Sequence, residues 1–563
     1  VSIWQCAGAE GSAFKELEKV PEDLEVAWAR SLVDVEDVRL RASCDIAQER
    51  ALKLRLLHPF LLLRVPPHGG ARGIGVVRQR FRLCEEGQYD RLVQLWRHDC
   101  SLLRRSQFEA FDECERERRV VDSAIRLLGK GKVSKAVKRL RASGLGDVSD
   151  ELIQQQLRAK HPRRRQDLPP LPEGLARIAV PNMADTLREL PDDVAPGTGG
   201  WRNEYLSCLV PAEGFGDERA DQVVASLESY AEAYVNGDLP PWYYLVTTTV
   251  RMVAPIKDEA REPGVEADGR SAVPDVRPLG IGCALRRAIT RTVFAQYMPS
   301  FASSLSPQQM GVAVSAGGLK LVFSIRELLA ANPEFVCVKL DEKNAFNSIT
   351  RATLLQRVID SEDLRPLARF FSAVLTPKSR VYLGGGYSMQ RADFDSEEGV
   401  QQGGVESAPG FCIGMHPELL ALDAEVRSTG GMARAGMDDS YVVGLPEVVF
   451  PAVRRFKAAL SVNTGLELRE DKSAYYATAT AVDAYLARSP AGPSLYELAG
   501  NIPPGYLVDA SGEFHHGLKV YGIPVGTDGY VRTFLECKCN AVMGICDKLT
   551  NQLSRRHKQS LWT

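Results

Sequence analysis

The feature that most restricts the fold is a run near the middle of the chain, residues 335–349, which begins apolar and becomes polar at one carboxylate. Residues 335–340 are β-formers and predict a buried strand. Asp341 follows at the carboxyl end of this strand, where an acid can hold a metal ion over a phosphate. After Phe346 the spacing becomes helical, with Thr350 as the expected N-cap. The predicted helix has one apolar face, formed by Ala352, Leu355, Val358 and Ile359.

A second acidic element lies 438 − 341 = 97 residues downstream, within residues 435–444. Apolar residues flank a tight polar turn there, which predicts a β-hairpin with Asp438 and Asp439 at its tip. An Asp-Asp pair alone is usually a solvated turn. If the hairpin lies beside the strand that ends at Asp341, however, the carboxylates converge and require cations. Two Mg²⁺ ions about 3.5–4 Å apart serve nucleotidyl transfer in this way, with Mn²⁺ as an alternative.

Composition and charge are those of an ordinary globular protein. The 563 residues are 44% hydrophobic and 25% charged, and this length predicts three or four folding units. The net charge of −2 leaves any nucleic-acid affinity to local basic patches. The 12 cysteines include no Cys-x2-Cys pair, which argues against a zinc ribbon or a disulfide framework. Reduced thiols predict an intracellular protein of the nucleus or cytoplasm, not a secreted one.

No segment reaches the roughly 18 consecutive apolar residues that a membrane span needs, so no membrane association is predicted. Residues near the start do not resemble a signal peptide. Because the first residue is Val1, we expect the chain to be a fragment of a longer reading frame.

Two basic clusters follow each other within a strongly helical stretch, residues 115–157, and just after it. Each charge alone is best interpreted as part of a solvated helix face, whereas two successive clusters equally favour a surface for a nucleic-acid backbone. A Pro-rich segment, residues 168–173, then predicts a domain boundary. The clusters comprise Lys130, Lys132, Lys135, Lys138, Arg139 and Arg141, and then Lys160, Arg163, Arg164 and Arg165.

Further candidate binding residues lie on either side of Asp341. Lys257 and Arg277 are on two predicted β-segments joined by a long loop, and such a pair suits a nucleotide triphosphate, although either could be a surface charge. Gln402 and Gly403 lie in a glycine-rich turn before an apolar helix. The glycines allow the backbone to approach a base pair and Gln402 can bind a ligand edge, while a plain loop-to-helix turn explains the glycines alone.

Taken in order, these blocks resemble the conserved blocks of reverse transcriptases, most closely those of non-long-terminal-repeat (LINE-like) retrotransposons. The resemblance covers roughly residues 120–535, and seven blocks in the right order make it specific. The blocks are Lys257, Arg277-Pro-Leu-Gly280, Leu340-Asp-Glu-Lys-Asn-Ala-Phe-Asn347, Gly399-Val-Gln-Gln-Gly403, Gly436-Met-Asp-Asp439, Lys472-Ser473 and Lys519-Val-Tyr-Gly522.

The resemblance implies a role for each matching residue. Asp341 and Asp438 would be the metal ligands, with Asp439 as the supporting third acid. Phe346 would be the aromatic gate that excludes a ribose 2′-hydroxyl. The remaining roles would be triphosphate binding by Lys257 and Arg277, contact with the nascent base pair by Gln402 and Gly403, protonation of pyrophosphate by Lys472, and a primer grip at residues 520–524.

The chain departs from the family pattern in three places. Gly436 stands where the family usually has Tyr or Phe before its aspartates, so an aromatic that normally packs near the primer is absent from that position. Gly404-Val405 replaces the common Asp-Pro after Gln-Gly, and Arg469 replaces a frequent Asn. None of these changes removes an implied metal ligand.

The predicted fold is α+β, a right-hand polymerase with fingers and an antiparallel palm sheet, a helical amino-terminal extension and a partial helical thumb. The implied function is RNA-directed DNA synthesis with an RNA template, a DNA primer and deoxynucleoside triphosphates. An inactive RNA-binding remnant of a retroelement and an RNA-dependent RNA polymerase remain alternatives. The expected divisions are a poorly defined region 1–120, a basic helical extension 121–190, fingers 191–330, palm 331–535 and the start of a thumb 536–563.

Overall fold

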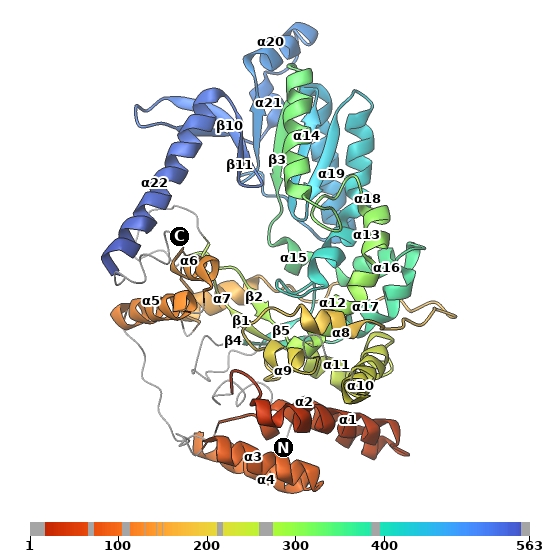
Figure 1. Cartoon of the computed structure of the whole chain (residues 1–563). Coiled ribbons are helices and arrows are strands. Elements are labelled where there is room, and N and C mark those ends of the chain that lie inside the picture. The colour runs from red at the N-terminus through yellow and green to blue at the C-terminus, as the bar shows by residue number, and fades with distance from the viewer. Residues whose placement is uncertain are drawn as a thin grey trace.

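The computed structural model describes residues 17–65, 73–103, 113–129, 131–141, 144–148, 150–210, 218–257, 274–383 and 394–552. Helices and small sheets are mixed along the chain, which confirms the α+β prediction (Figure 1). Within the described residues, no helix is both long enough and apolar enough to cross a bilayer. None of the cysteines whose side chains are described forms a disulfide.

The central sheet contains four strands in the order β6-β7-β3-β8 and is antiparallel throughout, as predicted for the palm. Its strands are β3 (Val336–Asp341), β6 (Met432–Gly436), β7 (Asp439–Gly444) and β8 (Ala474–Ala477). The predicted strand and hairpin are therefore confirmed.

Both faces of this sheet are buried because alternate β3 side chains enter different cores. Val336 and Val338 pack with α18 (Ser407–Arg427) and α19 (Pro446–Thr464), while Cys337 packs with α14 (Gly317–Ala331). Such alternation fixes the strand register, since a shift by one residue would exchange the two faces.

Helix α16 (Arg351–Asp360) buries the predicted apolar face, but its N-cap differs from the prediction. The Thr350 hydroxyl donates to the Thr464 carbonyl at 3.0 Å instead of accepting from the helix. The buried Glu398 carboxylate accepts from the Arg351 N–H at 2.8 Å in its place. A charged acceptor is a stronger partner for a helix start than a hydroxyl, which explains the change.

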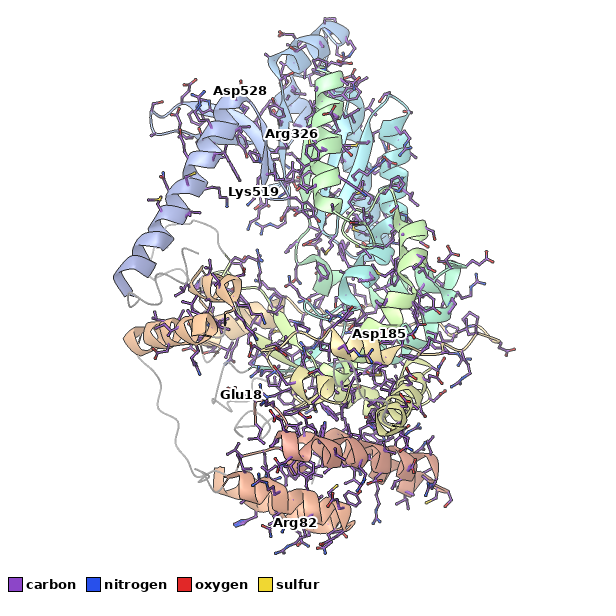
Figure 2. The ribbon with its side chains drawn as sticks, in the orientation of Figure 1. Glu18, Arg82, Asp185, Arg326, Lys519 and Asp528 are labelled. Carbon is purple, nitrogen blue, oxygen red and sulfur yellow. The ribbon has the colours of Figure 1, made fainter. Side chains whose placement is uncertain are left out.

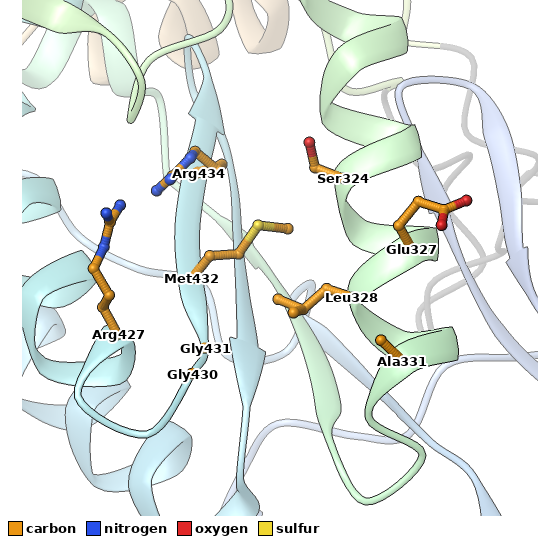
Figure 3. Close-up of a pocket in the computed structure, with 9 residues that line it drawn as sticks. All are labelled: Ser324, Glu327, Leu328, Ala331, Arg427, Gly430, Gly431, Met432 and Arg434. Carbon is orange, nitrogen blue, oxygen red and sulfur yellow. The ribbon is translucent and has the colours of Figure 1, made fainter.

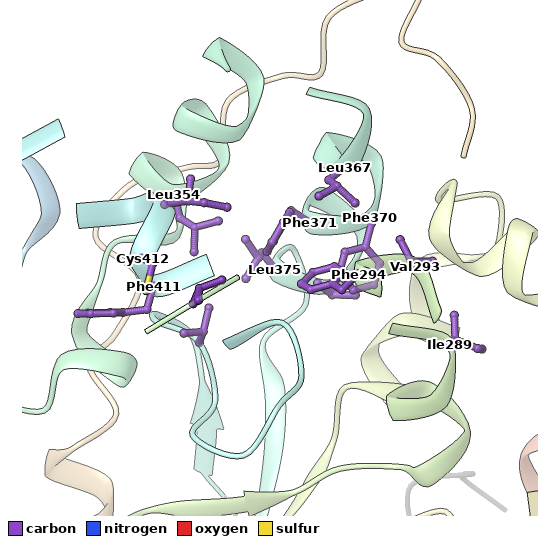
Figure 4. Packing of buried hydrophobic residues seen from close by; sticks show 14 of the residues in the cluster. Ile289, Val293, Phe294, Leu354, Leu367, Phe370, Phe371, Leu375, Phe411 and Cys412 are labelled. Carbon is purple, nitrogen blue, oxygen red and sulfur yellow. The ribbon is translucent and has the colours of Figure 1, made fainter. Parts of the chain in front are cut away.

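A second sheet has the order β2-β1-β4-β5, and its β1–β4 pair is parallel. In a separate hydrophobic cluster, aromatic side chains of several helices form a dense core, in which the Phe294 and Phe370 rings lie 5.6 Å apart (Figure 4). The strands are β1 (Val250–Val253), β2 (Leu279–Ile281), β4 (Ser379–Leu383) and β5 (Phe394–Ser396), and the helices are α12 (Ala284–Gln296), α13 (Met298–Leu305), η3 (Arg365–Leu367) and α17 (Ala368–Leu375).

A third sheet lies beside the long carboxyl-terminal helix, α22 (Asp528–Gln552). Residues 517–526 form a hairpin, and the described residues after 536 are helical, as predicted for that segment. In Figure 2, Lys519 is labelled on the exposed side of the hairpin and Asp528 at the start of α22. The strands are β9 (Tyr506–Val508), β10 (Phe514–Val520) and β11 (Ile523–Gly526).

The amino-terminal helices form a layer at the bottom of Figure 1 that packs onto α10 (Glu218–Val235) through α1. Trp28 is fully buried in this contact and its indole donates to the Tyr205 carbonyl at 2.8 Å. The buried Trp28 ring anchors the layer, and its indole hydrogen bond fixes the orientation of the layer. The layer contains η2 (Glu22–Leu24), α1 (Glu25–Leu40), α2 (Asp45–Leu62), α3 (Gly73–Glu85) and α4 (Tyr89–Leu103).

The basic segment after α7 (Glu151–Ala159) makes internal contacts. The Arg164 guanidinium donates to the Leu375 carbonyl at 2.9 Å, and the Arg165 N–H donates to Glu398 at 2.7 Å. The first contact holds the Arg164 guanidinium against the protein, whereas the second uses only the Arg165 backbone, and the Arg163 and Arg165 side chains are exposed. The remaining helices are α5 (Glu113–Gly129), α6 (Val133–Arg141), α8 (Met183–Arg188), α9 (Asn203–Ser207), α11 (Pro241–Thr247), α15 (Ala345–Ser348), α20 (Ala479–Arg488) and α21 (Leu495–Ala499).

Histidine burial makes stability depend on pH. His161 is buried, its Nδ1 donates to the Leu157 carbonyl at 2.7 Å, and desolvation lowers its pKa to about 4. A histidine whose pKa is lower in the folded than in the unfolded chain destabilises the fold as pH falls below about 6.5. The folded protein should lose about 2 kcal/mol per such histidine at pH 5 relative to pH 8.

Denaturant unfolding at both pH values checks this prediction. A His161→Gln protein should show a smaller loss on acidification than the parent, whatever its stability at pH 8. Equal losses in the two proteins would contradict it. Desolvation also lowers the pKa of His58 to about 3 and of His416 to about 4, so both should contribute similarly.

Candidate active site

Three carboxylates meet at one end of the central sheet. The register of β3 and β7 places Asp341 directly opposite Asp439. Gly436 is the last residue of β6 and pairs with Asp439, so Met437 and Asp438 form the two-residue turn between them. Residues opposite each other on antiparallel strands have Cα atoms about 4.5–5.5 Å apart. The register therefore brings the backbone positions of the three acids together at one end of the sheet.

The electrostatics of these acids reflect their crowding. Burial raises the pKa of Asp341, and Asp439 raises it further, against the attraction of Lys339 and Lys472. Asp438 is solvent-accessible at the hairpin tip, yet enough protein surrounds it for desolvation to raise its pKa, with a further contribution from the other two acids. Both carboxylates would be ionised more readily beside added positive charge.

A fourth acid, Glu342, escaped the sequence analysis. Its side chain is buried behind the acids, and one carboxylate oxygen accepts from the Ser440 hydroxyl at 2.9 Å. The other, Oε2, is buried without a hydrogen-bond partner among the described residues. Desolvation raises the pKa of Glu342 well above its usual range, and Asp438 is the next contributor. Its position directly after Asp341 was the available signal.

The acids are not arranged as a tight ligand group. Asp439 pairs with Lys339, whose Nζ lies 3.2 Å from the carboxylate, which keeps part of its charge neutralised. Among the described residues, a group of three side chains whose potential metal-ligand atoms lie within 4.8 Å of one another is found at a different place, at Asp509, Glu513 and His515. That group lies in the β9–β10 turn, where Asp509 accepts from the backbone and side chain of Ser511. Local turn bonding accounts for it.

Gln309 holds the acidic hairpin in its conformation. Met437 has a φ of 60°, which is uncommon for a residue with a side chain. The fully buried Gln309 accepts from the Met437 N–H at 2.9 Å and donates to the Met437 carbonyl at 3.0 Å. This amide clamp satisfies both backbone groups beside Asp438. Sequence patterns gave no signal for it, because the contact joins residues 128 apart.

Positive charge lines the approach to the acids. Arg277 is close enough to Asp438 to oppose the rise of its pKa, and Lys472 has the same effect on Asp341. Lys257 instead pairs with Asp275, 2.9 Å away, and Lys160 binds the same carboxylate. The long loop predicted between Lys257 and Arg277 lies largely outside the described residues.

The glycine-rich turn packs directly on β2. The Gly280 N–H donates to the Gln402 carbonyl at 2.8 Å. Gly403 has a φ of +110°, and a side chain there would meet the Gly280 carbonyl. A buried ion pair between Arg286 and Glu406 fastens the turn to α12. The structure thus brings Gln402 and Gly403 beside the block that contains Arg277, which a plain turn would not require.

Phe346 lies on the short helix α15 directly after the β3 acid. Its ring stacks on Phe411, with centroids 4.9 Å apart and planes inclined by 24°. The Phe346 carbonyl accepts from the Val400 N–H at 2.7 Å, which ties α15 to the segment before the glycine-rich turn. Phe346 is only partly buried.

A pocket of about 510 Å³ lies elsewhere, between α14 and the start of β6 (Figure 3). Arg427 and Arg434 line it, but both are paired with Asp423 at 2.7 and 2.6 Å. Met432, another lining residue, is four residues before Gly436, or about 13 Å along the strand. None of the three acids lines this pocket.

No protein-family model matches this sequence, and no curated protein matches it significantly. What the site can do therefore has to follow from its own residues and their arrangement.

Proposed function

We propose that this chain is an RNA-directed DNA polymerase, a reverse transcriptase like those of non-long-terminal-repeat retrotransposons. The observation that carries the proposal is the pairing of Asp341 with Asp439 across β3 and β7, with Asp438 in the adjoining turn. Acids from two sequence blocks 97 residues apart (438 − 341) meet at one end of a sheet. Lys472 and Arg277, from two further blocks, lie within electrostatic reach of them.

The donor set fits divalent cations that prefer oxygen ligands, Mg²⁺ first and Mn²⁺ as the alternative. Asp341, Asp438 and Asp439 would hold two ions. When bound, the ions would activate the primer 3′-hydroxyl and neutralise the charge that develops on the transferring phosphoryl group. Crowding and desolvation, which raise the pKa of Asp341 and Asp438, are what such cations would relieve.

The basic residues would handle the triphosphate. Arg277 is exposed and within electrostatic reach of Asp438, which suits contact with the phosphates through its forked guanidinium. Lys257 would exchange its bond to Asp275 for one to a phosphate. Lys472, beside Asp341, would supply a proton to the departing pyrophosphate.

The remaining residues would select the nucleotide. Phe346 would block a 2′-hydroxyl with its ring, and its stack on Phe411 would keep that ring in place. Gln402 and Gly403 would line the nascent base pair, where the absent side chain at Gly403 permits close approach. The proposed architecture is a right hand with fingers, palm and a partial thumb around an RNA template and a DNA primer, in an intracellular protein.

The direct test is oligo(dT)-primed extension on poly(rA) with dTTP and Mg²⁺. We expect synthesis that stops when EDTA removes the ion and resumes when Mg²⁺ is restored. Absence of synthesis, with poly(rA) binding retained, would favour the inactive RNA-binding remnant. Synthesis that prefers ribonucleotides would favour an RNA polymerase.

The Gln309 clamp gives a second prediction. Gln309→Leu removes both hydrogen bonds to Met437 and leaves its strained backbone without support. Loss of about 1–3 kcal/mol of stabilisation at this turn should lower the extension rate about 5–150-fold, because Asp438 would no longer be held in one position. Steady-state extension measures the effect.

Gln308→Leu is the matched control for the clamp. It loses the bond between Gln308 and Asp423, 2.7 Å long, but leaves the Met437 contacts intact. The two variants should be destabilised to a similar degree while only the Gln309 variant becomes slow. Equal rates in the two variants would contradict the role of Gln309.

A further inference from the structure

Glu342 is a buried carboxyl group with one oxygen left unsatisfied. The residue is only 7% exposed, and its Oε1 accepts from the Ser440 hydroxyl at 2.9 Å. Among the described residues, none donates a hydrogen bond to Oε2, which is fully buried. A buried carboxyl oxygen costs free energy unless a hydrogen bond or a cation compensates it. The free Oε2 is therefore available to a partner from outside the protein.

The leading charges around Glu342 are all negative. Desolvation is the main cause of its raised pKa, and the charges that raise it further are those of Asp438, Asp341 and Asp439. Asp438 contributes more than Asp341, although Asp341 is the neighbour of Glu342 in the chain. The carboxyl groups of Glu342 and Asp438 are therefore close. Carboxylates held together without a basic partner are stabilised by a divalent cation.

Strand register places Glu342 on the opposite face of the sheet from Asp341. Asp341 pairs with Asp439 across β3 and β7, and successive residues of a strand point to opposite faces. The hydrogen bond to Ser440, the residue after Asp439, shows that Glu342 points to the second face. Glu342 therefore adds a donor from the face that neither Asp341 nor Asp439 uses.

We propose that Glu342 is a further metal ligand in this chain, and that its free Oε2 binds, together with Asp438, one of the divalent cations of the proposed reaction. The inference rests on the proposed function, because that function assigns cations to Asp438. Two protein carboxylates are sufficient, since Mg²⁺ usually keeps several waters and is held by one or two carboxylates plus substrate phosphate. The cation would offset the burial of Glu342, and Glu342 would raise the affinity of the site for the cation.

Two other roles for Glu342 predict different behaviour. If Glu342 only holds Ser440 in place, its replacement should lower stability and leave cation binding unchanged. If its negative charge acts from a distance, any carboxylate at position 342 should serve equally well. A ligand requires both the charge and the length of the glutamate side chain.

Variants at position 342 separate these roles. Glu342→Gln keeps the size of the side chain and an acceptor for Ser440 but removes the charge. Glu342→Asp keeps the charge but withdraws the oxygens by one methylene. Glu342→Leu removes every ligand atom and suits a buried position. Glu467→Gln is the matched control, because it makes the same change at an exposed glutamate that pairs with Lys343, the residue next to Glu342.

The probe is Mn²⁺ alone, titrated into each metal-free protein and followed by the loss of the EPR signal of the free ion. We expect the Kd of the tightest ion to rise about tenfold or more in all three variants at position 342, at least the effect of losing a group that supports a metal ligand. Glu467→Gln should remain within about twofold of the parent, because its exposed charge is screened. Parental Mn²⁺ affinity in Glu342→Gln or in Glu342→Asp would overturn the proposal.

Thermal unfolding gives a second readout that does not depend on catalysis. A cation that binds only the folded chain stabilises it by mass action. Mn²⁺ should therefore raise the Tm of the parent and of Glu467→Gln more than that of the three variants at position 342, whatever the stability of each protein in EDTA. A variant at position 342 with a lower Tm in EDTA and the full Mn²⁺ shift would show that Glu342 has a purely structural role.

The inference can fail separately from the proposed function, because primer extension tests the function and Mn²⁺ binding tests the ligand. If the parent makes no DNA but binds Mn²⁺ more tightly than Glu342→Gln does, the polymerase proposal fails and the ligand assignment stands. If the parent makes DNA and every variant binds Mn²⁺ as the parent does, the function stands and Glu342 is not a ligand. A parent that binds no Mn²⁺ would also reject the ligand assignment.

Discussion

Replacing Asp438 by asparagine should lower DNA synthesis at least about 10³-fold, since several kcal/mol of charge stabilisation depend on ions held there. The change keeps the size of the side chain and suits a turn residue, so the hairpin should form as before. Removing the Asp438 charge should, if anything, reduce the repulsion that Asp341 and Asp439 experience. RNA binding should remain within about twofold of the parent, because carboxylates do not contribute favourable phosphate contacts.

The matched control is Asp360→Asn, which makes the same chemical change at an exposed residue at the end of α16. Primed extension on poly(rA) and binding of the same RNA should be measured for all three proteins. Synthesis by the parent and the control alone would locate the metal site at the hairpin. Retained synthesis by Asp438→Asn would exclude the proposed two-metal site.

Patterns of local sequence predicted the elements that position the acids. The run of β-formers in β3 and the polar tip of the β6–β7 hairpin are short-range properties, and each appears in a window of about ten residues. The pairing of Asp341 with Asp439 was expected only because both elements read as parts of one site. Lys257 shows the limit of such reasoning, since its bond to Asp275 depends on a loop return that no local pattern encodes.

The residues that shape the site most closely could not be found in this way. Gln309 contacts Met437 across 128 residues, and neither has a distinctive neighbourhood in the sequence. Glu342 is buried and accepts a hydrogen bond from Ser440 of β7, a contact between residues 98 apart in the chain. Tyr521 lies in the hairpin block that the sequence indicated, but its ring packs against Gly436, which is far away in the chain. Each is a long-range packing effect that overrides local preference.

Phe346 decides which nucleotide the proposed polymerase accepts. Phe346→Val removes the ring from its stack on Phe411 and opens space beside the acids. Accommodating an extra hydroxyl against the parental ring would cost about 1–3 kcal/mol, the usual range for overpacking. Relative efficiency with ribonucleotides should therefore rise about 5–150-fold in the variant, while deoxynucleotide use should change only a few-fold.

Phe346→Tyr is the matched control for this gate, because it retains the ring and should retain the discrimination. Steady-state kcat/KM for dTTP and UTP on poly(rA) gives the selectivity of each protein. If selectivity is the same in parent and Phe346→Val, then Phe346 is a packing residue of α15 and sugar choice is made elsewhere. If the parent already prefers UTP, the shared arrangement of acids belongs to an RNA polymerase, because the acids serve both sugars equally and only the gate distinguishes them.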